Sequence, residues 1–245
     1  MYRLNLFGVP ELTDEHGETI KFRTRRHLAV LIYLLLEGRE EPVSRSKLAS
    51  LVWPDSETRL ARQSLRQALA EIRAILGADA IASSPAGIVL KAEISPVVNT
   101  ECMCSHPDIP CSPLEDLGEW GGSQLAHWID AKRDRILTEL RHRLKQQLSE
   151  ARAAGDDRAV MDHAQKLHCI DPYNPLAVQA LAEGRLKEGD WAGALDLCRK
   201  RIKELEAELG PERAATVLTT LKRFERALLR DGPTRTEPPR IAPCG

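Results

Sequence analysis

Aromatic side chains and long apolar runs are both scarce in this sequence. Only 4% of the 245 residues are aromatic, although 42% are hydrophobic, so a core must be built mainly from Leu, Ala, Ile and Val. Such a core favours helices. The longest apolar candidate, Leu28 to Leu36, is too short to cross a bilayer. The first residues, MYRLNLFGVPEL, lack the basic-then-apolar pattern of a signal peptide. We therefore expect a soluble, cytoplasmic protein of one or two domains without membrane contact.

Strong net charge, a disulfide framework and catalytic motifs are missing as well. The formal net charge is −1, so affinity for a nucleic acid would have to come from a local cluster. Six cysteines in a chain of this length do not suggest a secreted disulfide scaffold. The sequence has no glycine-rich phosphate loop, no H-E-x-x-H and no nucleophile elbow, and its seven histidines are scattered. We expect a protein that is not an enzyme.

A local cluster of positive charge does occur between Arg59 and Leu76. Apolar residues recur there at spacings of four, three and four, which places them on one face of a helix: Leu65, Leu69, Ile72 and Leu76. At about 100° per residue, a second face collects Arg59, Arg62, Arg66 and Arg73, with Gln63 and Gln67 beside them. Guanidinium forks and carboxamides suit phosphates and base edges. The alternative is a solvated charged face of a surface helix.

The surrounding elements place this helix in a small domain. Before it we expect an antiparallel sheet and two helices, with Thr24 and Ser44 as their caps. The strands are expected at 2–7, 11–13 and 19–22, and the helices at 25–36 and 45–53. After it, residues 80–83 and 88–91 flank the turn Ser84 to Gly87 and predict a β-hairpin. This order describes a winged helix-turn-helix, in which the hairpin is the wing.

Several phrases of the sequence are similar to a known family. The opening LNLFGVPEL, the phrase LASLVWPD from Leu48 to Asp55, and ARQSLRQALAEIRAILG resemble the response-regulator-type winged helix of the SARP-like (Streptomyces antibiotic regulatory protein) activators. The resemblance covers residues 2 to about 92. Its most specific points are Leu48, Ala49, Trp53, Pro54, Asp55, Leu65, Leu69, Arg73 and Leu76.

The second half of the sequence predicts paired helices. A long helix is expected from Ser123 to Ala154, and a last one from Glu212 to Arg230. Between them Gly155-Asp156 recurs as Gly189-Asp190, 34 residues later, which is the period of a tetratricopeptide helical pair. Pro172 and Ala194 then fall at the closing proline and the small packing residue of that repeat.

This half of the sequence also resembles the same family. Residues from Gly155 to Gly210 look like the bacterial transcriptional activation domain that follows the winged helix there, and the resemblance extends over about 113–230. The fold class expected is mainly α with a small β component. Its expected parts are a winged-helix domain at 1–95, a connector at 96–122, a tetratricopeptide-like helical domain at 123–231 and a disordered tail at 232–245. Whether the natural chain continues past Gly245 is open.

The connector departs from the family pattern. Residues 93–123 are rich in proline, glycine and cysteine, which implies little regular structure. Four side chains within it, Cys102, Cys104, His106 and Cys111, offer thiolates and an imidazole for Zn²⁺ or another thiophilic ion. A reversible disulfide, Cys102–Cys104 or Cys104–Cys111, and an inert linker are the alternatives. A metal or redox change here would gate DNA binding. No cofactor is certain.

The resemblance implies a function. It implies a sequence-specific DNA-binding transcription regulator, an activator that binds direct repeats in promoters as a homodimer and contacts RNA polymerase. In the docking mode of this fold, the residues expected to face base edges are Thr58, Arg59, Arg62, Gln63 and Arg66. Those expected to contact phosphates are Arg25, Arg26, Arg45, Lys47 and Arg73. The alternative is a protein-interaction scaffold whose winged helix binds protein. The target promoter and the signal sensed are left open.

Overall fold

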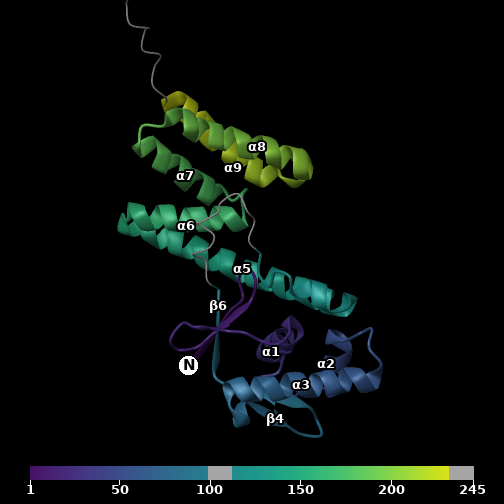
Figure 1. Cartoon of the computed structure of the whole chain (residues 1–245). Coiled ribbons are helices and arrows are strands. Elements are labelled where there is room, and N and C mark those ends of the chain that lie inside the picture. The colour runs from purple at the N-terminus through teal and green to yellow at the C-terminus, as the bar shows by residue number, and fades with distance from the viewer. Residues whose placement is uncertain (99–111, 232–245) are drawn as a thin grey trace, which may run out of the picture. The chain divides into compact units, whose positions relative to one another are not determined.

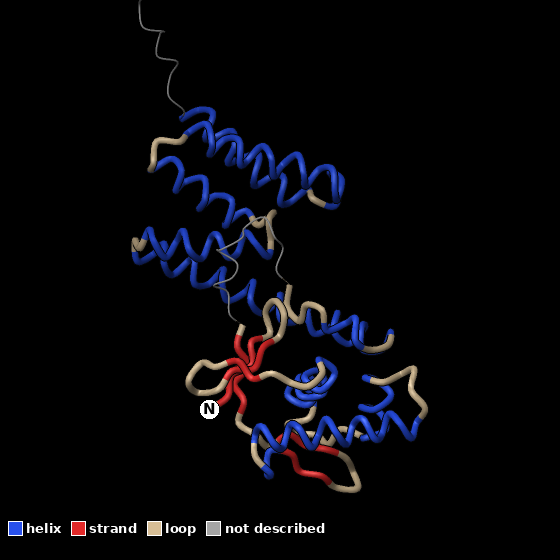
Figure 2. Tube along the Cα trace, in the orientation of Figure 1, coloured by secondary structure: helices blue, strands red, loops and turns tan. Residues whose placement is uncertain are grey.

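A computed structural model describes residues 1–98 and 112–231 of the chain (Figure 1). By its contacts the chain divides into two compact units, Met1–Leu140 and a second that begins at Arg141. The first combines a small sheet, helices and a hairpin, whereas the described part of the second is helical (Figure 2). The expected fold class, mainly α with a small β component, is confirmed. The division at Leu140 differs from the boundaries expected at 95 and 122, and it falls inside a helix.

The sheet of the first unit has four strands in the order β3-β2-β1-β6. Strands β1 (Tyr2–Asn5), β2 (Glu11–Thr13) and β3 (Thr19–Ile20) pair antiparallel, as expected. The fourth, β6 (Ile94–Val97), pairs parallel with β1, with Leu4 opposite Pro96. Two expectations are therefore corrected: the sheet is mixed, and residues 94–97 are not irregular. Pro96 fits because β6 lies at an edge of the sheet, where a missing N–H is tolerated.

Three helices pack against one another in the first unit: α1 (Arg25–Glu37), α2 (Arg45–Val52) and α3 (Thr58–Leu76). The Thr24 side chain accepts a hydrogen bond from the amide of His27, which confirms it as the cap of α1. Ser44 occupies the cap position of α2, but its hydroxyl lies 2.8 Å from that of Ser46 and makes no capping bond. The apolar stripe of α3 is buried as expected at Leu65, Leu69 and Ile72.

The hairpin after α3 forms the wing. A short 3₁₀ turn η1 (Ala78–Ala80) leads into β4 (Ile81–Ser83), which pairs antiparallel with β5 (Ile88–Leu90). The wing is joined to the connection between α1 and α2, because Val43 and Ile88 exchange two backbone hydrogen bonds of 2.8 and 2.9 Å. In Figures 1 and 2 the hairpin runs beside α3.

The core of the first unit also includes residues that follow the wing in the sequence. Leu114 and Leu117, the second at the start of the 3₁₀ turn η2 (Leu117–Trp120), are fully buried in it. So are Leu125 and Ile129, on the first turns of α5 (Ser123–Ala154).

Polar contacts fix the same part of α5 to α1. Trp128 donates a 2.8 Å hydrogen bond to Glu37 of α1 and its ring packs 4.7 Å from that of Tyr33, centroid to centroid. The start of α5 is therefore part of the first unit.

The second unit is built from α6 (Asp157–Ile170), α7 (Pro175–Lys187), α8 (Trp191–Arg213) and α9 (Ala215–Asp231), together with the end of α5. Each of these helices packs on the next, from α6 to α9. The last helix begins at Ala215, three residues after the expected Glu212, because α8 continues to Arg213. Ala194 is fully buried in the core of this unit, as the repeat predicts for its small residue.

The predicted 34-residue repeat is visible in matching hydrogen bonds. Gly155 and Gly189 both adopt a left-handed backbone, with φ of 70° and 82°. The residue after each, Asp156 or Asp190, donates its amide to a carbonyl five residues earlier, at 3.1 and 2.8 Å. Each aspartate side chain then accepts from the amide three residues later, at 3.0 and 2.8 Å. Both turns therefore end one helix and cap the next in the same way.

Within the described ranges, the structure contains no helix that combines the length and apolar character needed to cross a membrane.

Candidate functional site

The exposed face of α3 carries arginines that form no ion pair within the described ranges. Arg59, Arg62 and Arg66 are exposed, and none of them takes part in a salt bridge or a hydrogen bond to a described residue. The helix packs on the core through a neighbouring face, at Ala61 and Ile72. The guanidinium groups are therefore available to an outside partner.

A groove of about 790 Å³ runs along this face of α3. Its other walls are the beginning of α2 and the turn of the wing. The residues that line it are Ser44, Arg45, Ser46, Thr58, Arg59, Arg62, Leu65, Arg66, Leu69, Pro85, Ala86 and Gly87. Five predicted site residues thus come together from two helices: Arg45, Thr58, Arg59, Arg62 and Arg66.

Close contacts hold the wing wall of the groove in place. Arg45 donates a 2.7 Å hydrogen bond to the Ser84 carbonyl, which ties the start of α2 to the wing turn. Gly87 has φ of 152°, and a Cβ there would lie 2.5 Å from the Val43 carbonyl oxygen. Only glycine allows the wing to approach the α1–α2 connection so closely.

Arg73 is placed differently from the other arginines of α3. Its guanidinium donates to the Ile81 carbonyl at 3.2 Å and to the Ser83 hydroxyl at 3.0 Å, both on β4. Arg73 is not among the residues that line the groove. Its geometry suits holding the wing against α3.

The remaining predicted phosphate contacts lie outside the groove. Arg25 and Arg26 are exposed at the start of α1, and Arg25 lies 3.4 Å from Asp116. Lys47 lines a second hollow of about 490 Å³ between α2 and α3, which Thr58 and Arg62 also line. The predicted set is therefore spread over the groove, the second hollow, the start of α1 and the contact between α3 and β4.

The single acidic residue of α3, Glu71, pairs with the start of α1 and not with the arginines of its own helix. One oxygen of Glu71 accepts the Arg23 amide at 2.8 Å, and the other contacts the His27 ring nitrogen. Glu71 therefore fixes the start of α1 to α3, and its charge is satisfied there. The sequence pattern did not indicate this role, because the partners are 44 and 48 residues away in the chain.

Sequence reasoning also missed the hydroxyl and apolar groups of the groove wall. Ser44, Ser46, Pro85 and Ala86 line the groove beside Arg45. No periodic pattern marks these residues, since they stand at the ends of elements. Gln63, which was predicted, is exposed on α3 but is not among the groove-lining residues.

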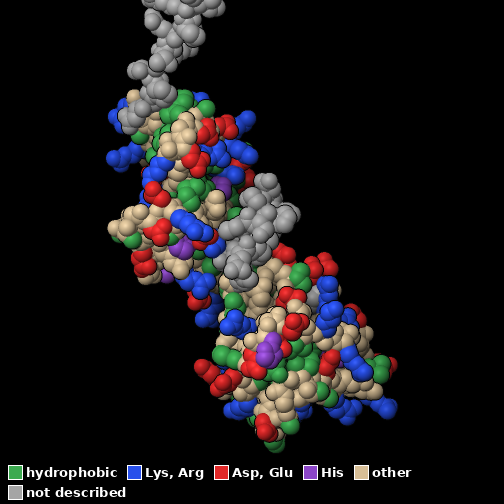
Figure 3. Space-filling view, turned by 60° about the vertical axis from the view of Figure 1, so that its left-hand side comes forward, with side chains coloured by type: hydrophobic (Ala, Val, Ile, Leu, Met, Phe, Trp, Pro, Cys, Tyr) green, Lys and Arg blue, Asp and Glu red, His purple; other side chains and the backbone are tan. Residues whose placement is uncertain are grey.

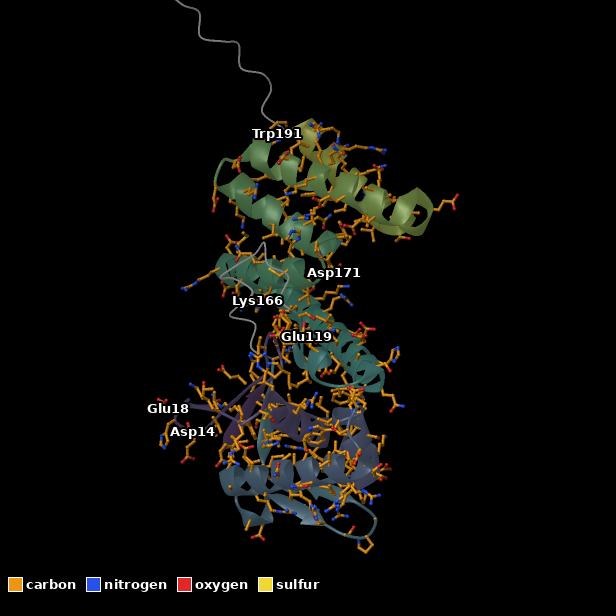
Figure 4. The ribbon with its side chains drawn as sticks, turned by 45° about the vertical axis from the view of Figure 1, so that its right-hand side comes forward. Asp14, Glu18, Glu119, Lys166, Asp171 and Trp191 are labelled. Atoms are coloured by element: carbon orange, nitrogen blue, oxygen red, sulfur yellow. The ribbon has the colours of Figure 1, made fainter. Side chains whose placement is uncertain are left out.

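The helical unit contains a histidine with a strongly altered pKa. Burial, followed by the charge of Arg201, lowers the pKa of His168 to about 4. Its Nδ1 is buried and has no hydrogen-bond partner in the described part of the chain. Nearby, Arg141 pairs with Asp171, labelled in Figure 4, at 3.2 Å, and Arg201 pairs with Glu204 at 2.7 Å. His168 is therefore neutral at pH 7, in a network of paired charges.

The predicted metal ligands Cys102, Cys104, His106 and Cys111 lie outside the described residues. Among the residues that are described, no group of three or more His, Cys, Asp or Glu side chains could hold a metal ion.

Comparisons with known proteins support the fold. No protein-family model matches the chain, and no curated protein does. The solved structure of Mycobacterium tuberculosis EmbR in complex with a low-affinity phosphopeptide is similar, with a TM-score of 0.59 and 19% sequence identity. The match covers 95% of this chain and 66% of the EmbR chain, so this chain spans slightly less than two thirds of the length of EmbR. At this level of identity, the two chains share a fold: a small sheet and helices followed by a helical domain.

Proposed function

We propose that this chain is a DNA-binding transcription regulator that inserts α3 into the major groove of double-stranded DNA. The observation that carries the proposal is the face of α3 on which Arg59, Arg62 and Arg66 are exposed beside the wing, with no partner among the residues that the structure describes. An α-helix has a diameter of about 10–12 Å and fits a major groove of about 12 Å. Arginine forks match guanine edges and phosphates.

The packing supports α3 as the inserted element. Its inner face is held by the core, so the helix is presented rigidly. The groove beside it offers guanidinium and hydroxyl groups from α2 as well, through Arg45, Ser44 and Ser46. Such groups fix register on the phosphate backbone, while the helix reads bases.

The finer parts of the proposal rest on the sequence resemblance. We infer an activator that binds promoter repeats as a homodimer and contacts RNA polymerase through its helical domain. The likeness to EmbR supports the order of the two domains and leaves these roles to experiment.

Selection from a random DNA library with the purified chain tests the proposal. We expect a motif that occurs as a direct repeat, bound by two copies of the chain. Affinity for this motif is expected to fall steeply with salt, by a log–log slope of about −0.9 for each phosphate neutralised. If no sequence is enriched and binding to any duplex is absent at low salt, the protein-scaffold alternative replaces the regulator.

Metal or redox gating at Cys102, Cys104, His106 and Cys111 remains a sequence prediction. Metal analysis of protein purified without added ions, beside a Cys104→Ser variant, tests the metal version. We expect metal in the unmodified chain and a large loss in the variant. Equal and negligible metal in both would remove it, and thiol counting before and after reduction then tests the disulfide.

A further inference from the structure

One large apolar side chain stands on α3 outside its buried stripe. Leu60 is 53% exposed, whereas the apolar residues that hold α3 in place, Ala61 and Leu65, are 4% and 2% exposed. On a helix, Leu60 lies nearly opposite Thr58 and Arg62, which both line the groove. The groove beside the wing therefore does not account for Leu60.

The neighbours of Leu60 on the helix surface are carboxamides. Gln63 and Gln67 follow it by three and seven residues, so the three side chains form one ridge along α3. All three are exposed. Arg59 and Arg66, which line the groove, are the groove residues nearest to this ridge, by the same helical geometry. An apolar group followed by two carboxamides is a combination that the edges of A·T pairs can satisfy, because adenine offers N6 and N7 to a carboxamide and thymine offers its methyl group to an apolar side chain.

We propose that Leu60 is a specificity-determining residue that contacts the 5-methyl group of a thymine in the bound site, next to the base pair that faces Gln63. The inference rests on the proposed function. It extends the set of base-reading residues to the side of α3 away from the wing. The arginines on one side of the helix and the ridge of Leu60, Gln63 and Gln67 on the other would then face the two strands that border the major groove of the DNA.

Replacing single thymines by uracil tests this contact directly, since uracil lacks only the methyl group. With the duplex obtained by selection, each thymine is replaced in turn and the dissociation constant is measured by fluorescence anisotropy. For the unmodified chain we expect a three- to tenfold loss of affinity at one thymine of each half-site. For Leu60→Ala we expect equal binding to thymine and uracil at that position.

Two further variants separate this role from others. Gln63→Ala is expected to weaken binding and to keep the thymine–uracil difference. Leu229→Ala, which removes another exposed leucine (47% exposed) from the helical unit, is expected to change neither. Thermal unfolding of Leu60→Ala should match the unmodified chain, because the side chain is more than half exposed.

Three results would overturn the inference. It fails if no uracil replacement weakens binding by the unmodified chain, or if Leu60→Ala keeps the full thymine–uracil difference. It also fails if Leu60→Ala changes the number of copies bound per duplex while that difference stays intact, since Leu60 would then contact a second copy. In each case the chain still binds its selected site. Absence of any selected site would instead refute DNA binding itself, and this inference with it.

Discussion

The arginines of the two units of the chain have different surroundings. In the helical unit the arginines that the structure describes in ion pairs include Arg141, Arg152, Arg199 and Arg201, each within 3.2 Å of an acidic oxygen. Basic and acidic side chains lie next to each other over this unit in Figure 3. On α3 of the first unit, Arg59, Arg62 and Arg66 have no such partner among the described residues, and Glu71 is occupied by α1.

The lesson is that position beside the wing distinguishes the candidate site. Arg223 and Arg226 on α9 are also exposed without an ion pair among the described residues, but the three arginines of α3 named above line the groove next to the wing. A net charge of −1 for the whole chain conceals a face of one sign. A paired guanidinium would have to leave its carboxylate to bind a phosphate, whereas an unpaired one loses only water. One acidic group of the first unit, Asp14, has backbone partners of its own: in the turn between β2 and β3 (Figure 4) it accepts the amides of His16 and Glu18, and the Glu18 amide lowers the pKa of this exposed carboxyl.

Removing arginines from each unit tests this comparison most directly. A chain with both Arg62→Ala and Arg66→Ala is expected to bind its selected site about 30-fold more weakly or worse, since each bidentate contact contributes roughly 1–3 kcal/mol. Arg199→Ala, which removes an arginine paired with Glu225, is expected to leave affinity unchanged. Mobility-shift titration at moderate salt measures both. Equal affinity in all three proteins would refute the role of α3.

The next largest effect is expected for the stability of the chain when the wing wall of the groove is altered. Gly87→Ala should lower the free energy of unfolding by about 2–4 kcal/mol, because the new methyl meets the Val43 carbonyl and the backbone is left-handed. Gly17→Ala is the matched control, with φ of 86° and open space around it, and should cost about 1 kcal/mol. Urea unfolding followed by circular dichroism compares them. Equal losses would mean that the wing can move away from Val43 at little cost.

A pH change should act on the helical unit through His168. Its pKa is lowered to about 4 in the folded chain, against an ordinary value of 6.5, so the unfolded chain binds more protons between these values. Stability is therefore fully present above pH 6.5 and declines as the pH falls toward 4, by about 1–2 kcal/mol after allowance for partial exposure. Urea unfolding at pH 7 and pH 5 should show a smaller decline in His168→Gln than in the unmodified chain. His142→Gln, at an exposed site on α5, controls for the substitution. Identical declines in all three would contradict this assignment.

The smallest expected effect separates Arg73 from its neighbours on α3. Arg73→Lys keeps the charge but loses the fork that reaches both Ile81 and Ser83, so we expect a stability loss of about 0.5–1.5 kcal/mol and less than a threefold change in DNA affinity. Arg66→Lys should do the reverse, with unchanged stability and clearly weaker binding. If Arg73→Lys weakens binding as much as Arg66→Lys at unchanged stability, Arg73 is a phosphate contact after all.

Much of the local structure could be predicted, because it depends on neighbours in the chain. The span of α3, the Thr24 cap and the two glycine turns at 155 and 189 follow from periodicity and turn chemistry. Strand β6 could not be predicted, since Pro96 argues against a strand and the pairing partner β1 is some 90 residues away. The long helix α5 was also expected, but its periodicity does not say which core Leu125 and Ile129 enter.

The amino-acid sequence by itself determined which side of α3 is apolar and which carries guanidinium groups, because a helix of 3.6 residues per turn separates them without help from the rest of the chain. Only the tertiary structure decided which of those groups stay unpaired. Arg73 and Arg59 have the same side chain, yet β4 lies beside the first and no described partner lies beside the second. Contacts between residues distant in the chain supply or withhold a partner, and periodicity carries no information about them.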